Sequence, residues 1–181
     1  MKILPTAIPG PLLIEPSVFG DDRGFFFEAW SAAEFAENGL DVSFVQDNHS
    51  RSQKGVLRGL HFQNPKSQGK LVRVATGAVY DVAVDIRRSS PYFGKWIGVE
   101  LSAENKRLLW VPKGFAHGFL TLRDQTDFLY KCDAEYSADN EHTLAWDDPS
   151  IGIDWPLQGI QPLLSDKDRS GKTLAEIESF A

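Results

Sequence analysis

The sequence predicts an all-β protein, a sandwich or barrel of short strands with a few short helices. Ten short apolar runs alternate with glycine, proline, asparagine and aspartate residues, which are typical of the turns between strands. One of these runs, AVYDVAVDIR, alternates regularly between apolar and polar residues, as a strand with two different faces does. Helical signals are confined to two short segments. Together these observations favour an all-β architecture over alternating helices and strands.

The expected strands are distributed along most of the chain. They cover residues 12–18, 24–30, 42–49, 56–62, 70–75, 78–86, 96–101, 107–111, 117–121 and 127–133. The two faces of the strand over 78–86 carry Tyr80, Val82, Val84 and Ile86 on one side and Asp81, Ala83, Asp85 and Arg87 on the other. If the polar face met solvent it would be an ordinary surface, whereas inside a barrel it would line a polar cavity.

Two segments carry helix signals. Ser31 followed three residues later by Glu34 forms a capping box, and Gly39 stands where a helix would end, so we expect a helix over 31–38. The segment GKTLAEIESFA, which follows Ser170, predicts a second helix at the C-terminal end. Its apolar stripe would consist of Leu174, Ile177 and Phe180.

Length and composition indicate an ordinary globular protein. A chain of 181 residues suits one domain spanning residues 1–181. With 42% hydrophobic and 24% charged residues, the chain does not resemble disordered or fibrous proteins. The net charge of -6 argues against a nucleic-acid partner, although a local cluster of arginine and lysine could hold one phosphate-bearing small molecule.

The cysteine count and the N-terminal segment predict a cytoplasmic protein. Cys132 is the single cysteine, so it cannot form an internal disulfide, which fits a reducing compartment. Pro5 and Pro9 interrupt the N-terminal segment before the apolar core of a signal peptide develops. No apolar run approaches membrane-spanning length, so we expect no membrane partner.

The strand VLRGLHFQ contains two polar residues, Arg58 and His61, within an apolar run. Strict alternation places them on opposite faces, because they are an odd number of residues apart. Gly59 lies between them and would permit a β-bulge that brings both to one face. A histidine in a strand is more often a packing residue than a catalyst, so its neighbours must decide its role.

These neighbours resemble the two-part motif of cupins, jelly-roll proteins in which His-x-His, a glutamate and a later histidine hold a metal in the barrel. His61 matches the first histidine, and His117 in PKGFAH matches the last. Gln63 stands in place of the second histidine, and Lys70 in place of the glutamate. Because a protonated lysine has no lone pair for a metal, we expect a site without a metal ion.

A lysine cation beside a histidine suits proton abstraction next to a carbonyl. The ammonium group can stabilise a developing enolate, while a neutral imidazole removes the proton from carbon. Histidine has an ordinary pKa of about 6.5, near the working pH that such a base requires. A carboxylate bonded to its other ring nitrogen would fix the tautomer.

A larger set of motifs is similar to one family. FGDDRGFFFEAW, FVQDNHSRS, GVLRGLHFQ, KLVRVATGAVYDVAVDIR, VPKGFAHGF and LLSDKD occur in this order between residues 12 and 169. They resemble the dTDP-4-dehydrorhamnose 3,5-epimerase family, whose members use no metal or organic cofactor. The resemblance implies a cupin-type double-stranded β-helix, or jelly roll. It also implies conversion of dTDP-4-dehydro-6-deoxy-D-glucose to dTDP-4-dehydro-L-rhamnose, a step of L-rhamnose and polysaccharide biosynthesis.

The resemblance also implies roles for individual residues. His61 matches the general base, Asp168 its carboxylate partner, Tyr130 the acid on the opposite face of the sugar ring, and Lys70 the group that stabilises the enolate. The residues matching the substrate contacts are Arg23, Phe26, Glu28, Gln46, Asn48, Arg58, His117, Tyr136, Glu141 and Lys167. Arginine suits diphosphate oxygens, amides suit pyrimidine edges, and an aromatic ring suits stacking on the base.

Several alternatives remain open from the residues alone. Asp81 and Asp85 compete with Asp168 as partners of His61, and Tyr130 and Tyr136 could exchange roles. Rival activities are epimerisation at one carbon or ketoisomerisation of the same sugar nucleotide. A metal-dependent cupin oxygenase and a sugar-nucleotide binding module without activity are less favoured. Family members are dimers, so we also expect a homodimer in which the segment from Arg23 to Glu28 serves the partner's site.

Overall fold

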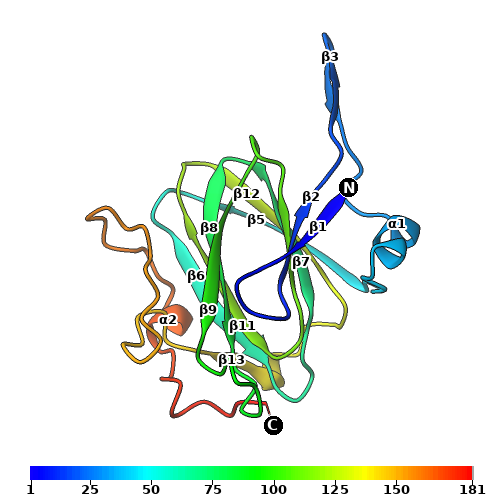
Figure 1. Ribbon diagram of the computed structural model, residues 1–181. Helices are drawn as coiled ribbons and strands as arrows, with labels where there is room; N and C mark the ends of the chain where they lie inside the picture. The colour runs from blue at the N-terminus through cyan, green and yellow to red at the C-terminus, as the bar shows by residue number, and fades with distance from the viewer. Residues whose placement is uncertain (181) are drawn as a thin grey trace.

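Two antiparallel sheets face each other in the computed structural model, which describes residues 1–180 (Figure 1). The six-stranded sheet has the order β1 (Lys2–Pro5), β2 (Leu12–Glu15), β10 (Leu108–Val111), β7 (Lys70–Thr76), β12 (Thr126–Cys132) and β5 (Gln46–Ser52). The five-stranded sheet has the order β13 (Glu141–Thr143), β6 (Leu57–Gln63), β11 (Phe115–Thr121), β8 (Ala78–Asp85) and β9 (Trp96–Ser102). The predicted all-β jelly roll is confirmed.

Short elements complete the fold. Strands β3 (Phe19–Asp21) and β4 (Gly24–Phe26) form a separate hairpin. The helices are α1 (Ala32–Glu37), α2 (Asp166–Arg169) and the 3-10 turn η1 (Ala138–Asn140). Within residues 1–180, no helix is long and apolar enough to cross a membrane.

The main core lies between the two sheets. It joins Val72 and Leu109 of the six-stranded sheet to Val79 and Ala83 of the five-stranded sheet, each with 0% exposure. The rings of Phe119 and Phe128 stack across the interior with their centroids 4.1 Å apart. The stacked pair therefore links the two sheets through the core.

A second apolar layer covers the outer face of the five-stranded sheet. Val82, Val84 and Ile86 pack there against residues of the C-terminal third of the chain, including Trp155 and Ile177. The polar face of β8 therefore turns to the barrel interior, where the Asp81 side chain is fully buried. Of the two alternatives for this strand, the inward one is correct.

All ten predicted strands have a counterpart in the structure, but three of them differ by three or more residues, and the one expected over 12–18 ends at Glu15. The expected strand over 24–30 ends at Phe26, and the one over 42–49 begins only at Gln46. For these last two the reason is packing, because Trp30 contacts Phe44 edge to face and Phe44 contacts Trp110 in the same way on the outer face of the sheet. Sequence reasoning missed the short strands β1, β3 and β13.

The first predicted helix is confirmed and the second is wrong. Helix α1 begins after Ser31, whose hydroxyl accepts the N–H of Glu34 at 3.5 Å. The chain over 171–180 forms turns and isolated bridges instead of a helix, and Ala181 lies outside the described residues. Its backbone bonds to other segments: Arg88 N–H donates to the Phe180 carbonyl at 2.8 Å. These long-range bonds replace those of a helix while Ile177 still reaches the core.

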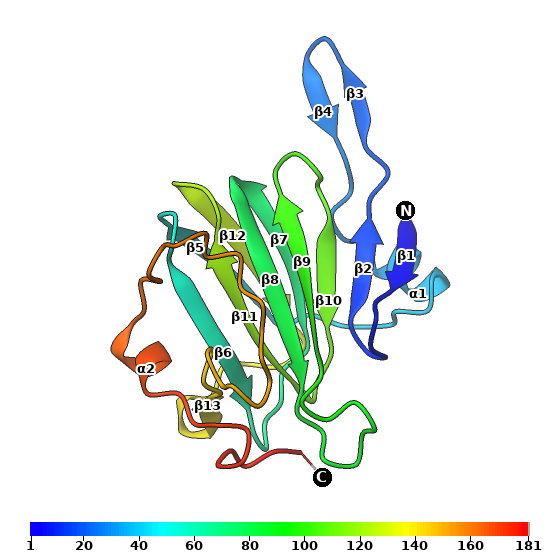
Figure 2. The same ribbon diagram turned by 60° about the vertical axis from the view of Figure 1, so that its left-hand side comes forward.

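The hairpin of β3 and β4 projects away from both sheets (Figure 2). Its three phenylalanines Phe19, Phe25 and Phe26 have 66%, 63% and 70% of their surface exposed. So much exposed aromatic surface on a two-stranded arm is typical of a contact with another molecule.

Candidate active site

A pocket of about 280 Å³ opens between the two sheets. Strands β5, β7 and β12 supply one wall and β6 and β11 the other, and residues near β13 and α2 form the rim. Nine of the predicted site residues line it: Gln46, Arg58, His61, Lys70, His117, Tyr130, Tyr136, Glu141 and Lys167.

A bulge in β6 brings Arg58 and His61 to the same pocket. His61 pairs with His117 of β11, but Arg58 pairs with Phe119, so β6 contains one extra residue at this point. Gly59 occupies the bulge with φ 112°, and a Cβ atom there would lie only 2.6 Å from the Gly118 Cα. The bulge expected from the sequence is present, and the close approach of strands β6 and β11 requires glycine at this position.

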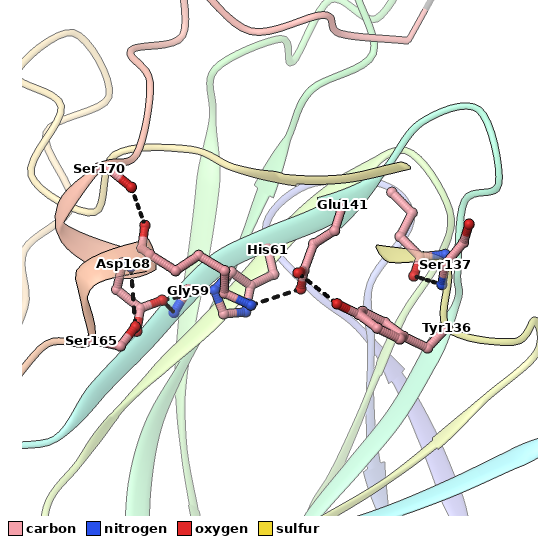
Figure 3. A network of polar contacts seen from close by, with 10 residues as sticks. Gly59, His61, Tyr136, Ser137, Glu141, Ser165, Asp168 and Ser170 are labelled. Atoms are coloured by element: carbon pink, nitrogen blue, oxygen red, sulfur yellow. Dashed lines mark hydrogen bonds and ion pairs between the residues drawn. The ribbon is translucent and has the colours of Figure 1, made fainter. Parts of the chain in front are cut away.

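Asp168 is the carboxylate partner of His61. Its Oδ1 lies 2.7 Å from the His61 Nε2 and accepts the Gly59 N–H at 3.0 Å (Figure 3). The Ser165 hydroxyl lies 2.6 Å from Oδ2 and also caps α2 by accepting the Asp168 N–H at 3.2 Å. The Ser165 cap at the start of α2 therefore holds the carboxylate beside the imidazole.

The two rival carboxylates are engaged elsewhere. Asp85 binds Arg87 at 2.6 Å and the Ser90 hydroxyl at 2.7 Å. Asp81 lies 2.9 and 3.1 Å from the Nε2 atom of His117. Burial raises the pKa of Asp81, although His117 and the charge of Lys70 oppose the shift.

Burial and hydrogen bonding set the charge states of the His61–Asp168 pair. Burial by itself raises the pKa of Asp168, but the bonds from His61, Ser165 and Gly59 outweigh it and hold the pKa well below its usual range. Burial lowers the pKa of His61, and its bond to Asp168 opposes this only in part. At neutral pH the imidazole is therefore neutral, with the proton on Nε2 and a lone pair on Nδ1.

Lys70 and Tyr130 enter the pocket from neighbouring strands of the six-stranded sheet, β7 and β12. Burial lowers the pKa of Lys70, while the charges of Cys132, Glu141 and Asp81 act in the opposite direction. Burial raises the pKa of Tyr130, so its phenol keeps its proton at neutral pH.

At the rim, Tyr136, Glu141 and Lys167 form a chain of polar contacts (Figure 3). The Tyr136 hydroxyl donates to Glu141 at 2.9 Å, and the Lys167 ammonium donates to the other oxygen of Glu141 at 2.9 Å. Burial raises the pKa of Glu141, but these two donors outweigh it and the net shift is downward. Tyr136 is 54% exposed at the mouth, whereas Tyr130 lies inside, so the two tyrosines occupy distinct places.

Asn48 and the arm residues do not line the pocket. The Asn48 amide accepts from Gln46 at 3.0 Å and donates to the Cys132 sulfur at 3.7 Å. Arg23 and Phe26 lie on the projecting hairpin, and Glu28 follows it. One copy of the chain does not bring these three residues to its own pocket.

Several lining residues were missed by sequence reasoning. They are Ser50, Phe62, Gln63, Gln68, Gly118, Phe119 and Phe128. The period of a strand could have found Ser50 and Phe119, each two residues after a named site residue. Gln68 carries no local signal. Within residues 1–180, the Ser50 hydroxyl is buried without a hydrogen-bond partner.

Over residues 1–180, no three His, Cys, Asp or Glu side chains gather in a group that could hold a metal ion. At the position of the second cupin histidine, Gln63 uses its amide on the main chain instead, donating to the Lys66 carbonyl at 2.6 Å and accepting the Ser137 N–H at 2.9 Å.

Comparison with known proteins gives consistent matches over the whole chain. A family model described as dTDP-4-dehydrorhamnose 3,5-epimerase matches residues 5–176. A protein of that name from Pseudomonas aeruginosa is 57% identical over 181 residues, covering 99% of each chain.

Solved structures of related epimerases also resemble this chain over nearly its whole length. The Legionella pneumophila dTDP-6-deoxy-D-glucose-3,5-epimerase in complex with dTDP-4-keto-L-rhamnose has a TM-score of 0.94 and 53% identity, covering 98% of this chain and 94% of that one. A 3'-monoepimerase from Streptomyces bikiniensis in complex with dTDP-quinovose has a TM-score of 0.90 and 37% identity, covering 95% and 87%.

Proposed function

Because the chain belongs to the dTDP-4-dehydrorhamnose 3,5-epimerase family, we propose that its pocket converts dTDP-4-dehydro-6-deoxy-D-glucose to dTDP-4-dehydro-L-rhamnose. The enzyme is then an isomerase of deoxysugar and L-rhamnose biosynthesis that inverts the two carbons flanking the 4-keto group. The observation that carries the proposal is the His61–Asp168 pair, 2.7 Å apart, at a pocket that also contains Lys70 and Tyr130.

In the first half of each inversion, His61 acts as the base. Its Nε2–H donates to the ionised Asp168, so Nδ1 holds the lone pair that takes the proton from carbon. The electrons of the broken C–H bond move onto the keto oxygen and form an enolate. Lys70 stabilises this charge, and the nearby carboxylates of Asp81 and Glu141 favour its ammonium form.

In the second half, Tyr130 acts as the acid. Its raised pKa keeps the phenol protonated until the enolate carbon takes the proton on the face opposite His61. The phenolate regains a proton from water and His61 loses one to water, which restores both groups for the second carbon. No step requires a metal ion or an organic cofactor.

Arg58, His117 and the rim residues serve as substrate contacts. Arg58 and His117 adjoin the base in the pocket, and Tyr136 at the mouth stacks on the thymine. Stacking of an aromatic ring on a base contributes about 1–3 kcal/mol. Glu141, Lys167 and Gln46 supply the polar contacts of the nucleotide end, while Asn48, outside the pocket lining, orients the Gln46 amide by accepting its N–H.

Proton NMR in heavy water tests the proposed reaction. Incubation of dTDP-4-dehydro-6-deoxy-D-glucose with the enzyme is expected to place deuterium at both carbons that flank the ketone. His61→Asn is expected to lose this exchange by about a hundredfold or more, and His49→Asn, on an exposed side chain of β5, to retain it. Absence of exchange with the unaltered chain would overturn the proposal.

Epimerisation at one carbon is the second candidate, favoured by the similarity to the Streptomyces bikiniensis 3'-monoepimerase. The two activities differ in whether Tyr130 can reach both carbons. The same NMR experiment separates them, because a monoepimerase places deuterium at one carbon only.

We further propose a homodimer in which the β3–β4 hairpin of each chain completes the partner's pocket. Arg23 and Phe26 stand on an exposed arm away from their own pocket, and Glu28 follows them. In the partner's pocket, the arginine suits the diphosphate, and the phenylalanine and glutamate suit the nucleoside.

Mixing two inactive variants tests this arrangement. His61→Asn lacks the base but keeps Arg23 on its hairpin, whereas Arg23→Glu lacks the hairpin arginine but keeps the base. If the arm serves the partner, half of the dimers in an equal mixture contain one complete site, so activity recovers to about a quarter of the unaltered enzyme. No recovery on mixing, with exchange of subunits verified by mass spectrometry, would exclude the shared site.

A further inference from the structure

Gln63 holds the main chain on both sides of Tyr136. Its Oε1 accepts the Ser137 N–H at 2.9 Å, and its Nε2 donates to the Glu135 carbonyl at 3.4 Å (Figure 3 shows the Ser137 contact). The second hydrogen of Nε2 goes to the Lys66 carbonyl at 2.6 Å. Because both amide hydrogens are used, Gln63 has no donor left for a ligand, although it lines the pocket.

Two further glutamines hold the same segment. Gln68 Nε2 donates to the Ala134 carbonyl at 2.8 Å, and Gln46 Oε1 accepts the Tyr136 N–H at 2.8 Å. Each of the four residues 134–137 therefore has a main-chain group bonded to a glutamine side chain of the pocket wall. This segment lies between β12 and η1 and belongs to no strand, so these bonds take the place of a sheet ladder.

The Tyr136 ring is also held at its other end. Its hydroxyl donates to Glu141, which in turn binds Lys167. The ring is 54% exposed and has little packing of its own to fix it. An exposed ring held at both ends before a ligand arrives loses little conformational entropy when a base stacks on it.

We propose that Gln63 and Gln68 are positioning residues that hold the Tyr136 ring over the mouth of the pocket for the base of the nucleotide. They act through the main chain of 134–137 and not by touching the nucleotide. This inference deepens the proposed function, since it assigns to these glutamines the affinity for the nucleotide half of the substrate.

Binding of dTDP, measured by titration calorimetry, tests the inference. Gln63→Met preserves the side-chain length and removes all three bonds, so dTDP is expected to bind about tenfold more weakly. KM for the sugar nucleotide is expected to rise by a similar factor, with kcat unchanged within about twofold. Gln68→Met removes one bond and is expected to have a smaller effect; it also serves if Gln63→Met does not fold.

A double-mutant cycle with Tyr136→Ala distinguishes positioning from other roles. Without the ring there is nothing to position, so Gln63→Met is expected to cause no further loss of dTDP affinity in the Tyr136→Ala background. Equal losses in both backgrounds, or no loss in either, would overturn the inference. Failure of the unaltered chain to bind dTDP would instead contradict the proposed function. Gln161→Met, at an exposed position, is the matched control and is expected to leave the affinity unchanged.

Discussion

The pKa values of two buried aspartates beside the pocket are shifted in opposite directions because their surroundings differ. Asp168 receives bonds from His61, Ser165 and Gly59, which hold its pKa low despite burial. Among residues 1–180, His117 is the one side chain that bonds to the Asp81 carboxylate, and burial raises the pKa of Asp81. Asp168 beside His61 is therefore more readily ionised than Asp81 beside His117.

The pH dependence of kcat/KM should follow His61. The base must be neutral to accept a proton. The value of kcat/KM should therefore be highest above the pKa of His61 and should fall as the pH drops through that pKa. Burial places that pKa below the ordinary value of about 6.5, so the acid limb should lie below 6.5.

Asp168→Asn should move this limb to still lower pH, because the lost carboxylate favours the imidazolium. The rate at neutral pH should fall about a hundredfold or more, since an amide N–H facing Nε2 favours the wrong tautomer. Asp166→Asn, on the exposed side of the same helix, is the control and should leave the profile unchanged. An unchanged profile in Asp168→Asn would contradict the assigned pair.

Tyr130→Phe should separate the two halves of the reaction. The base remains, so deuterium exchange on the His61 face should persist within about tenfold, while formation of inverted product falls roughly a hundredfold to ten-thousandfold. NMR in heavy water measures both quantities in one sample. Equal loss of exchange and inversion would argue against Tyr130 as the acid. Tyr92→Phe, a tyrosine outside the pocket lining, should change neither.

At the scale of the element, the β6 bulge and the short helix α2 form the site together. The bulge turns Arg58 and His61 to one face and directs the Gly59 N–H to Asp168. Helix α2 supplies that carboxylate from its first turn, where the Ser165 cap fixes it. A four-residue helix has little stability of its own, so the bonds to β6 hold it in place.

Gly59→Ala should damage both stability and activity. A Cβ atom there lies 2.6 Å from the Gly118 Cα and 2.7 Å from the His117 carbonyl oxygen, at a positive φ. Strain and overpacking together should cost about 2 kcal/mol or more in urea unfolding. Gly39→Ala is the matched control, because Gly39 also has a positive φ but open space around it, and it should cost about 1 kcal/mol. Equal costs would show that the close approach is not limiting.

At the scale of the whole molecule, the sandwich has an inner and an outer apolar layer, and the pocket depends on both. The C-terminal segment covers the five-stranded sheet, which allows both faces of β8 to be buried. Because that cover leaves the polar face of β8 directed inward, Asp81 reaches His117 inside the barrel.

Ile177→Ala tests the contribution of this cover. Ile177 is 4% exposed in the outer layer, so its truncation should lower the free energy of unfolding by about 2–4 kcal/mol in urea. The kcat/KM of the folded protein should stay within about twofold, because Ile177 is not part of the pocket lining. Val45→Ala, at a side chain with 60% exposure, should change stability by less than about 0.5 kcal/mol. A similar loss for both variants would contradict a packed outer layer.

The sequence alone predicts features that local chemistry encodes. The alternation of β8, the Ser31 cap of α1 and the bulge at Gly59 depend on residues close together in the chain. The spacing of His61, Lys70 and His117, with the motifs around them, predicts the jelly roll and the family. Nine of the predicted site residues could therefore be named before the structure.

The tertiary structure alone decides how distant segments meet. His61 and Asp168 are 107 residues apart, so no local pattern selects Asp168 over Asp81 and Asp85; the family resemblance implies the pair, and the contact shows it. The segment over 171–180 has a helical pattern but instead forms isolated bridges to Arg87 and Leu144, outside the strands. Gln68 bonds to the Ala134 carbonyl before Tyr136, and no local pattern predicts this bond. Hydrogen bonds between distant segments depend on the register of the strands and on which face of the sheet is covered. The local sequence of one segment determines neither of these, so it cannot predict the segment's partner.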